Sequence, residues 1–485
     1  MTITSPTIVL TVGASSLTFT GSEIISANLV EEINPLSVEL PFNVLEFTIL
    51  SYNTSFSMFS GNIYNLLSER LPIMAYENVN GVSTFLGKFY LDKWTNLTEY
   101  KFQFRAIDVI GTMAATDYEG GFWSIPTTLE TVLNQVLLPK NIVFTIDDTL
   151  KSIPIQGWIP PGDYRSALQQ ICFAAGVVAS CARSDRLMIS PIIFPFVKYD
   201  YKLTKADKLK DEPIELTPLV TSIELVSHSF TQGTDIQTIF DKYLEVGSHK
   251  IIFDQPYYSI VIDGPGYVPL LFINENGDFI VTENSDYIEA GGQYTFGPNS
   301  INLEMQEAGQ VTITGYPWVD SKRSYLFYET GLTEYANKNA LTISDATMIN
   351  ETNAQAILDQ IRDYYRQRYK QTITTISSEI QTNDIVLSST IFNRKILTTV
   401  LKMDMDLTGG NLQTNEILGI EPIYVEPIEF VSRKAITGIA LPGMDLTYNN
   451  RWRTQTTQTL VRYARTGVAI CGEELMFNNQ WRIYG

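Results

Sequence analysis

The sequence predicts an α+β fold that is mostly β and divided into several domains. A chain of 485 residues is too long for one ordinary hydrophobic core and long enough for three or four. Short runs that alternate apolar and polar residues recur along most of the chain, separated by glycine, proline and asparagine. Only three stretches carry apolar residues at the spacing of a helix. Together these observations favour β-sheet domains with a smaller helical part.

Residues 1–120 are predicted to form a first β domain. The runs 85–91 and 100–106 alternate apolar and polar residues on either side of the polar stretch 95–99. This pattern predicts an antiparallel hairpin with one buried face. Further β-favouring runs, broken by glycine and proline, lie at residues 7–11, 16–20, 36–40 and 44–50.

Residues 121–200 are predicted to form a compact α/β module. A helix is expected from residue 127, because the apolar residues that follow fall on one stripe. A second helix is expected over 163–175, ended by Gly176. A β-hairpin closes the module, with strands at 177–182 and 187–193 and a polar turn at 183–186.

The charged stretch 201–215 is predicted to be a linker, and residues 216–431 a second β domain. Dense glycine, proline, asparagine and aspartate between 245 and 300 indicate a small inserted β subdomain. The second domain also holds a predicted helix, 353–369, and a predicted strand, 401–408. Strands pair around a similar pattern in both β domains, which leaves a diverged duplication open.

Charge and cysteine usage exclude several classes of protein. The net charge of −19 argues against a nucleic-acid coat and against attachment to anionic lipid. No apolar run is long enough to span a bilayer, and no signal peptide is expected at the N-terminus. The odd number of cysteines favours buried thiols in a reducing compartment. Residues 432–485 are a basic C-terminal extension of about +4, so the rest of the chain carries about −23.

No group of residues has the spacing of a catalytic or metal site. The two histidines, His228 and His249, stand apart from any nucleophile motif, and His228 is expected to be a hydrogen-bonded strand residue. Cys172 and Cys181 are expected in the core of the α/β module. The acidic pairs at 147–148 and 404–406 are expected in a turn and on a solvated strand face. The sequence therefore predicts no catalytic residue, no cofactor and no metal ligand.

Several strings resemble hub proteins of phage tail tips and baseplates, including those of phage-tail-like particles. In the first β domain these are Ile25–Glu32, Pro35–Pro41, Leu45–Ile49, Gly87–Trp94 and Phe102–Gly111. Further along they are Asp163–Ile171, Ala174–Gly176, Asp185–Ile189 and Gly309–Pro317. The likeness spans residues 25–430 in pieces and omits 245–300 and the basic extension.

The resemblance implies a non-enzymatic trimer in which each chain carries two β-barrel domains of the tail-tube type. Three such chains would form a pseudo-sixfold ring that adapts a sixfold tail tube to a threefold central spike. Its partners would be the tube protein, the spike protein and other baseplate proteins, with DNA passing through its channel without specific binding. It would be assembled in the host cytoplasm and reside in the tail baseplate of the virion.

Three other functions compete with the hub. A wedge or distal tail protein belongs to the same class and differs in copy number and symmetry. A tail-associated cell-wall hydrolase is disfavoured by the scarcity of histidine and the lack of a catalytic motif. A secreted β-rich adhesin is disfavoured because no signal peptide is expected.

Overall fold

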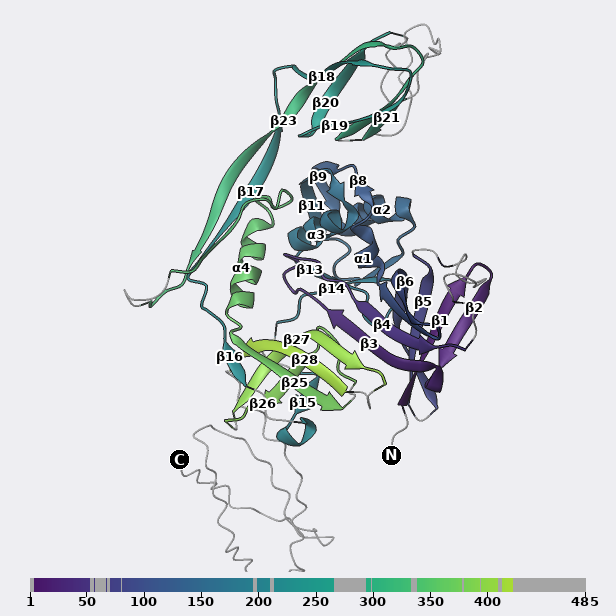
Figure 1. Ribbon diagram of the computed structural model, residues 1–485. Coiled ribbons are helices and arrows are strands. Elements are labelled where there is room, and N and C mark those ends of the chain that lie inside the picture. The colour runs from purple at the N-terminus through teal and green to yellow at the C-terminus, as the bar shows by residue number, and fades with distance from the viewer. Residues whose placement is uncertain are drawn as a thin grey trace, which may run out of the picture. The chain divides into compact units, whose positions relative to one another are not determined.

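The computed structural model divides the chain into two compact units, residues 1–423 and 424–485. The description below covers residues 4–52, 56, 67, 70–79, 81–194, 199–209, 213–265, 294–297, 299–332, 338–376, 379–392, 394–408 and 412–421. The predicted basic extension, 432–485, lies outside the described residues. The described part is an α+β fold that is mostly β and contains several sheets, which confirms the predicted fold class (Figure 1).

Seven strands form what we call the first half of a 13-stranded sheet. They are β1 (Thr4–Val12), β2 (Ser15–Thr20), β3 (Ile24–Glu32), β4 (Val44–Leu50), β5 (Pro72–Val79), β6 (Val82–Thr98) and β7 (Lys101–Ile107). Their order in the sheet is β3-β4-β7-β6-β5-β1-β2. The hairpin expected from the two alternating runs is confirmed as β6 and β7, with a shorter turn than predicted. Alternate residues of these strands, such as Leu29, Phe47 and Phe104, form a buried core on one face.

The strand expected at 36–40 is wrong. The chain between β3 and β4 is a connecting loop, in which Ser37 adopts a left-handed backbone with φ 51°. Leu36 and Leu40 are apolar because they pack into the core of the neighbouring α/β module. The apolar residues at alternating positions are therefore explained by a loop whose side chains are buried, and not by a strand.

Residues 109–191 contain the helices and short sheets of the α/β module. Its elements are α1 (Val109–Met113), β8 (Asp117–Tyr118), β9 (Gly121–Thr128), α2 (Leu129–Leu137), β10 (Phe144–Ile146), β11 (Pro154–Ile159), β12 (Gly162–Asp163), α3 (Tyr164–Ala175), β13 (Val177–Ser180) and β14 (Leu187–Pro191). Both predicted helices and the closing hairpin are confirmed. Asp163 caps α3 by accepting a hydrogen bond from the Ser166 amide, and left-handed Gly176 ends it.

Six strands form the second half of the 13-stranded sheet. They are β15 (Tyr201–Leu203), β16 (Ile214–Leu216), β25 (Tyr369–Ile376), β26 (Ile385–Ser389), β27 (Lys395–Asp406) and β28 (Leu412–Ile420). Their order is β16-β25-β28-β27-β26-β15. The stretch expected to be a linker thus contributes two short strands, and Leu203 is buried in the sheet's core. A strand of three residues is too short to show an alternating pattern of apolar and polar residues, so these two strands could not be recognised within the charged segment.

The two halves repeat one topology, with β16, β25, β28, β27, β26 and β15 in the places of β3, β4, β7, β6, β5 and β1. A β-bulge supports the match, since β6 slips between Leu91 and Lys93 against β7 and β27 slips between Val400 and Lys402 against β28. One pairing differs, because β15 runs parallel to β26 while β1 runs antiparallel to β5. The shared strand order favours the duplication that the sequence left open.

An arm is inserted in the second half between β16 and β25, where the first half has only the loop 33–43. It consists of β17 (Ser222–Gln232), β18 (Gln237–Leu244), β19 (Gly247–Ile252), β20 (Tyr257–Asp263), β21 (Tyr294–Gly297), β22 (Ser300–Met305), β23 (Gly309–Tyr328), β24 (Ala340–Ile343) and α4 (Ala354–Tyr365). The expected end of a strand at Gly315 is wrong, because β23 runs on to Tyr328 along β17. The predicted helix is present but ends at Tyr365, since β25 begins at Tyr369.

Asn299, a buried residue of the arm, is one of several that contact the α/β module. The Trp158 indole donates to the Asn299 side-chain oxygen at 2.9 Å, and the Asn299 amide donates to the Ile159 carbonyl at 3.2 Å. Gly120 lies against this side chain with φ +88°, and a Cβ there would lie 2.1 Å from the Asn299 nitrogen. Only glycine therefore fits this position.

Replacing Gly120 with alanine is expected to loosen the contact between the arm and the module. The left-handed backbone alone costs about 1–2 kcal/mol for a residue with a Cβ, and Asn299 must also move. Hydrogen exchange should accelerate at residues 299–305. Gly162→Ala is the matched control, because a Cβ at Gly162 meets nothing within 4 Å. Equal exchange in both variants would contradict the prediction.

Candidate functional site

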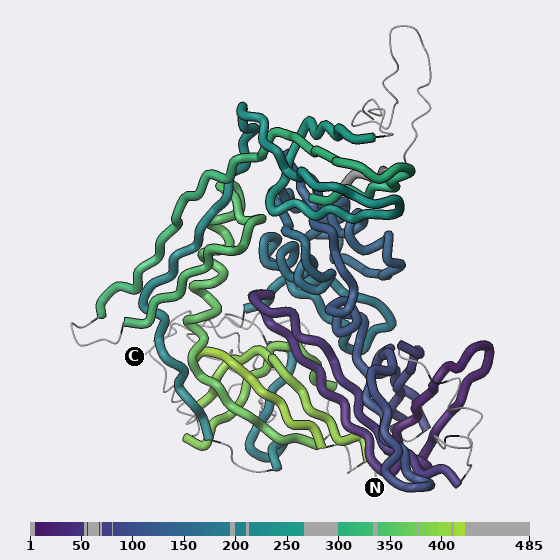
Figure 2. Tube along the Cα trace, turned by 45° about the horizontal axis from the view of Figure 1, so that its top comes forward, coloured from purple at the N-terminus to yellow at the C-terminus, as the bar shows by residue number. Residues whose placement is uncertain are grey.

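The two halves are joined edge to edge by strands β3 and β27, a junction that we call the seam. Five residue pairs form it, from Glu32 opposite Lys402 to Asn28 opposite Asp406. The seam unites segments about 370 residues apart in the chain into one 13-stranded sheet (Figure 2).

One hydrophobic core runs beneath the seam. The buried side chains of β3 and β4 share a cluster with those of β25, β27 and β28, including Met403 and Met405. Each apolar side chain buried here contributes roughly 1.5–3 kcal/mol relative to exposure. The two halves of the sheet therefore share one hydrophobic core and are not independent domains joined by a linker.

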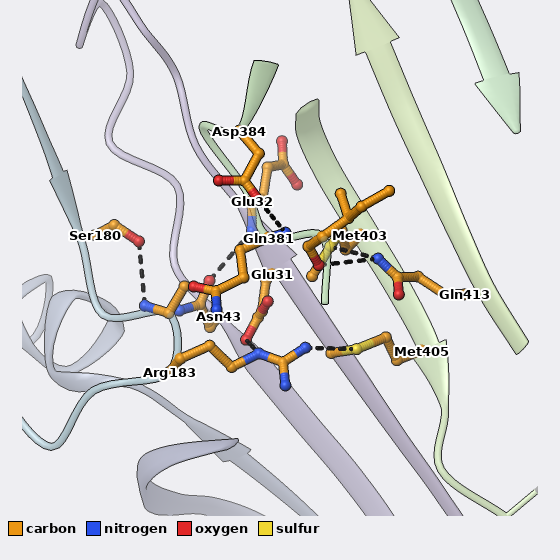
Figure 3. A network of polar contacts seen from close by, with 12 residues as sticks. Glu31, Glu32, Asn43, Ser180, Arg183, Gln381, Asp384, Met403, Met405 and Gln413 are labelled. Atoms are coloured by element: carbon orange, nitrogen blue, oxygen red, sulfur yellow. Dashed lines mark hydrogen bonds and ion pairs between the residues drawn. The ribbon is translucent and has the colours of Figure 1, made fainter. Parts of the chain in front are cut away.

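The turn between β13 and β14 inserts a cation from the α/β module into the seam. Arg183 adopts a left-handed backbone with φ 53°, and its side chain is 15% exposed. Its Nε lies 3.0 Å from Oε1 of Glu31 on β3, and its Nη2 donates to the Met405 sulfur of β27 at 3.0 Å (Figure 3). One side chain of the module thus touches both halves of the sheet.

Glu31 is the acidic partner at the seam, and it is unusually buried. Its side chain is 1% exposed, on the core face of β3. Burial raises the pKa of Glu31, and the Arg183 charge opposes that rise. The pair is close enough for an ion pair, yet neither Glu31 oxygen makes a well-aligned hydrogen bond to a described residue. Breaking one partner of such a buried pair leaves the other uncompensated.

A second buried carboxylate orders the loop that enters β4. Asp108 accepts hydrogen bonds from the backbone amides of Asn43 at 2.8 Å and Gly111 at 3.0 Å, and it caps α1. The Asn43 side-chain oxygen accepts from the Glu32 amide at 3.1 Å. Burial raises the pKa of Asp108 to about 6, while the backbone donors oppose the rise. Buried polar groups therefore link the α/β module to β3 and β4 of the first half.

The opposite, solvent-facing side of the seam carries paired charges. Lys402 lies 3.0 Å from Glu32 across the seam. Within the second half, Lys370 lies 2.7 Å from Glu416. The neighbouring carboxylates, of which Glu32 contributes most, raise the pKa of Lys402. Such exposed pairs contribute little to stability and instead favour the correct register of the strands.

The candidate chemical residues of the sequence do not come together. His228 lies on β17, where Nδ1 is 2.8 Å from Asp320 and Nε2 is 3.1 Å from the Ser344 carbonyl, so both ring nitrogens are engaged as predicted for a strand residue. His249 lies on β19. Cys172 and Cys181 are buried in the module core, as predicted, and burial raises the pKa of both thiols, that of Cys172 to about 12.

The acidic pairs also occupy the predicted settings. Asp147 accepts from the Thr149 amide at 2.9 Å in a turn, and Asp404 is exposed on β27. Within the described ranges, no three His, Cys, Asp or Glu side chains are grouped as metal ligands. No helix in the same residues is both long and apolar enough to cross a membrane.

The residues that build the seam were not singled out from the sequence. The sequence predicts Arg183 only as part of a polar turn, and it brings in Glu31 only within the string Ile25–Glu32. A signal was present for Glu31, because it occupies the position after Ala27 and Leu29 in an alternating strand, where the pattern demands an apolar residue. A carboxylate in a core-facing position predicts a buried cationic partner.

No protein-family model matches the chain, and no curated protein matches it. Among solved structures, it is similar to the prophage tail protein gp18 from Listeria monocytogenes EGD-e, with 9% identity, a TM-score of 0.45, and coverage of 86% of this chain and 95% of that one. It is similar to the tail protein from Neisseria meningitidis MC58, with 9% identity, a TM-score of 0.47, and coverage of 85% and 96%. It is also similar to the prophage MuSo2 43 kDa tail protein from Shewanella oneidensis, with 10% identity, a TM-score of 0.45, and coverage of 85% and 98%. At these identities and TM-scores the likeness assigns no function.

Proposed function

We propose that this chain is a structural, non-enzymatic protein of a phage tail or a phage-tail-like injection particle. Three copies would form the hub at the tail tip, in the baseplate of a particle assembled in the host cytoplasm. The hub would adapt a sixfold tail tube to a threefold central spike and line the channel between them. The proposal starts from the resemblance of the strings between residues 25 and 430 to hub proteins of this kind.

The observation that carries the proposal is the internal repeat of the sheet. Each chain holds two halves of the same strand order, joined edge to edge at the seam. Three chains would therefore present six similar halves, which is what a protein between sixfold and threefold partners requires. We propose the two halves as the two tube-like domains, the first within 1–120 and the second within 216–431 extended by β15 and β16, with the α/β module of 121–200 between them in the chain.

The buried polar groups suit a mechanical role. Arg183, Glu31 and Asp108 are engaged in holding strands and turns in place, and none faces an open cleft. On the solvent-facing side of the seam Lys402 is paired with Glu32 while Asp404 is exposed, so this face is acidic, which supports passage of DNA without specific binding. Tube, spike and other baseplate proteins are the proposed partners.

The mass of the purified chain in solution tests the hub. Light scattering behind a sizing column is expected to give about three times the 54.6 kDa of one chain. Because six similar halves arise only in the trimer, a stable dimer or tetramer would contradict the proposal. A chain that remains monomeric at every concentration would favour a wedge or distal tail protein.

A further inference from the structure

We propose that the seam is repeated between copies of the chain, with strand β16 of one copy pairing antiparallel with residues 93–96 of β6 in the next. The inference rests on the proposed trimeric hub and adds to it the strands and the register that join the copies. It follows from two equivalences between the halves, that of β6 with β27 and that of β16 with β3.

The first step is that β6 corresponds to β27. Each is the long strand of its half, and each has a bulge followed directly by a lysine, Lys93 and Lys402. Beyond the bulge in β27, residues 402–406 have passed the end of β26 and pair with β3 instead. The seam is therefore built on the part of β27 that its own half leaves open.

The second step is that β6 has the same open edge. Its residues 82–90 pair with β5, and beyond residue 91 no described strand pairs with β6 on that side. The open edge, residues 93–96, lies between two register shifts of β6 and contains no proline, and an unpaired strand edge is a template for another strand.

The third step is that β16 corresponds to β3. Through their pairings with β25 and β4, Glu215 takes the place of Val30 and Leu216 takes the place of Glu31. Glu31 is 1% exposed on a strand that pairs with β27, whereas Leu216 is 54% exposed on a strand whose outer edge has no described partner. A leucine at the equivalent of a buried position indicates a missing strand.

The register follows from the seam. Val30 lies opposite Asp404 and Glu31 opposite Met403, so Glu215 would lie opposite Thr95 and Leu216 opposite Trp94 of the next copy. Leucine against an aromatic ring is a favourable cross-strand pair. The contact joins two different surfaces of the chain, so it is head-to-tail and gives a ring if the rotation closes.

A cysteine pair tests this register directly. In a background with Cys471→Ser, Glu215→Cys combined with Thr95→Cys is expected to cross-link copies under mild oxidation, because directly opposed side chains lie within disulfide reach. Glu215→Cys combined with Asn96→Cys is the matched control, because Asn96 points to the other face of β6. Equal cross-linking in the two variants, or none in the first, overturns the proposed pairing.

The same experiment separates this inference from the hub itself. Cross-linked closed trimers support both, whereas trimers without a Glu215–Thr95 cross-link overturn only the strand pairing. Cross-linked open polymers retain the pairing and overturn the trimer. As a second variant, Leu216→Asp is expected to weaken association at least tenfold while circular dichroism stays unchanged, since Leu216 is exposed in the single chain. Unchanged association would overturn the pairing.

Discussion

Replacing Arg183 with methionine is expected to destabilise the seam by about 3–5 kcal/mol, the usual cost of removing one partner of a buried ion pair. Methionine fills most of the same space but leaves the Glu31 carboxylate, which is 1% exposed, without its cation. The variant also loses the contact to the Met405 sulfur on β27. Hydrogen exchange should accelerate in β3 and in the second part of β27, because both contact this side chain.

Two controls separate charge from shape in this prediction. Arg183→Lys keeps the cation and should lose less stability than Arg183→Met. Glu31→Gln combined with Arg183→Met removes both charges and should recover part of the loss, as a double-mutant cycle would register. If Arg183→Met unfolds like the natural chain, the guanidinium does not stabilise the seam.

Replacing Asp108 is the second change with a large expected effect. Asp108→Ala removes the acceptor of the Asn43 and Gly111 amides and is expected to cost about 2–4 kcal/mol, because each buried donor left unpaired costs about 1–3 kcal/mol. Asp108→Asn retains one acceptor oxygen and should lose much less. The midpoint of chemical unfolding, followed by the exchange of residues 43–50 and 109–113, measures both.

The same carboxyl predicts how stability depends on pH. Burial raises its pKa from 3.8 to about 6 in the folded chain, so the folded state binds the proton more tightly than the unfolded state does. Its contribution to stability therefore rises as pH falls through about 6 and levels off below 3.8. The full change is roughly 3 kcal/mol, of which somewhat more than 1 kcal/mol falls between about pH 7.5 and about pH 5. Asp108→Asn should lose this component, and an unaltered pH profile in that variant would contradict the assignment.

Local signals allowed the helices and several strands to be predicted from the sequence. The helix 164–175 has an aspartate cap, regular apolar spacing and a glycine at its end, and all three act within the segment itself. The strand at 401–408 was found from its alternation, although β27 begins earlier, at Lys395. Where the structure depends on neighbouring residues alone, sequence periodicity was enough.

The seam, the short strands and the full length of β23 could not be predicted in this way, because they depend on contacts between residues distant in the chain. β15 and β16 are three residues each, too short for a period of two to be visible. Gly315 looked like the end of a strand, yet it lies inside β23, where Ile239 and Ile260 pack closely over it. Arg183 looked like an ordinary turn residue because only the folded chain brings β3 and β27 to it.

The insertion of the arm between β16 and β25 has a consequence for how this chain varies among its homologues. The equivalent place in the first half is a loop of about ten residues, so the same position accepts either a short loop or a whole subdomain without disturbing the strand order. Differences in length between homologous chains should therefore concentrate at this point and at its counterpart after β3. The strands on either side, β16 and β25 here and β3 and β4 in the first half, should keep their length.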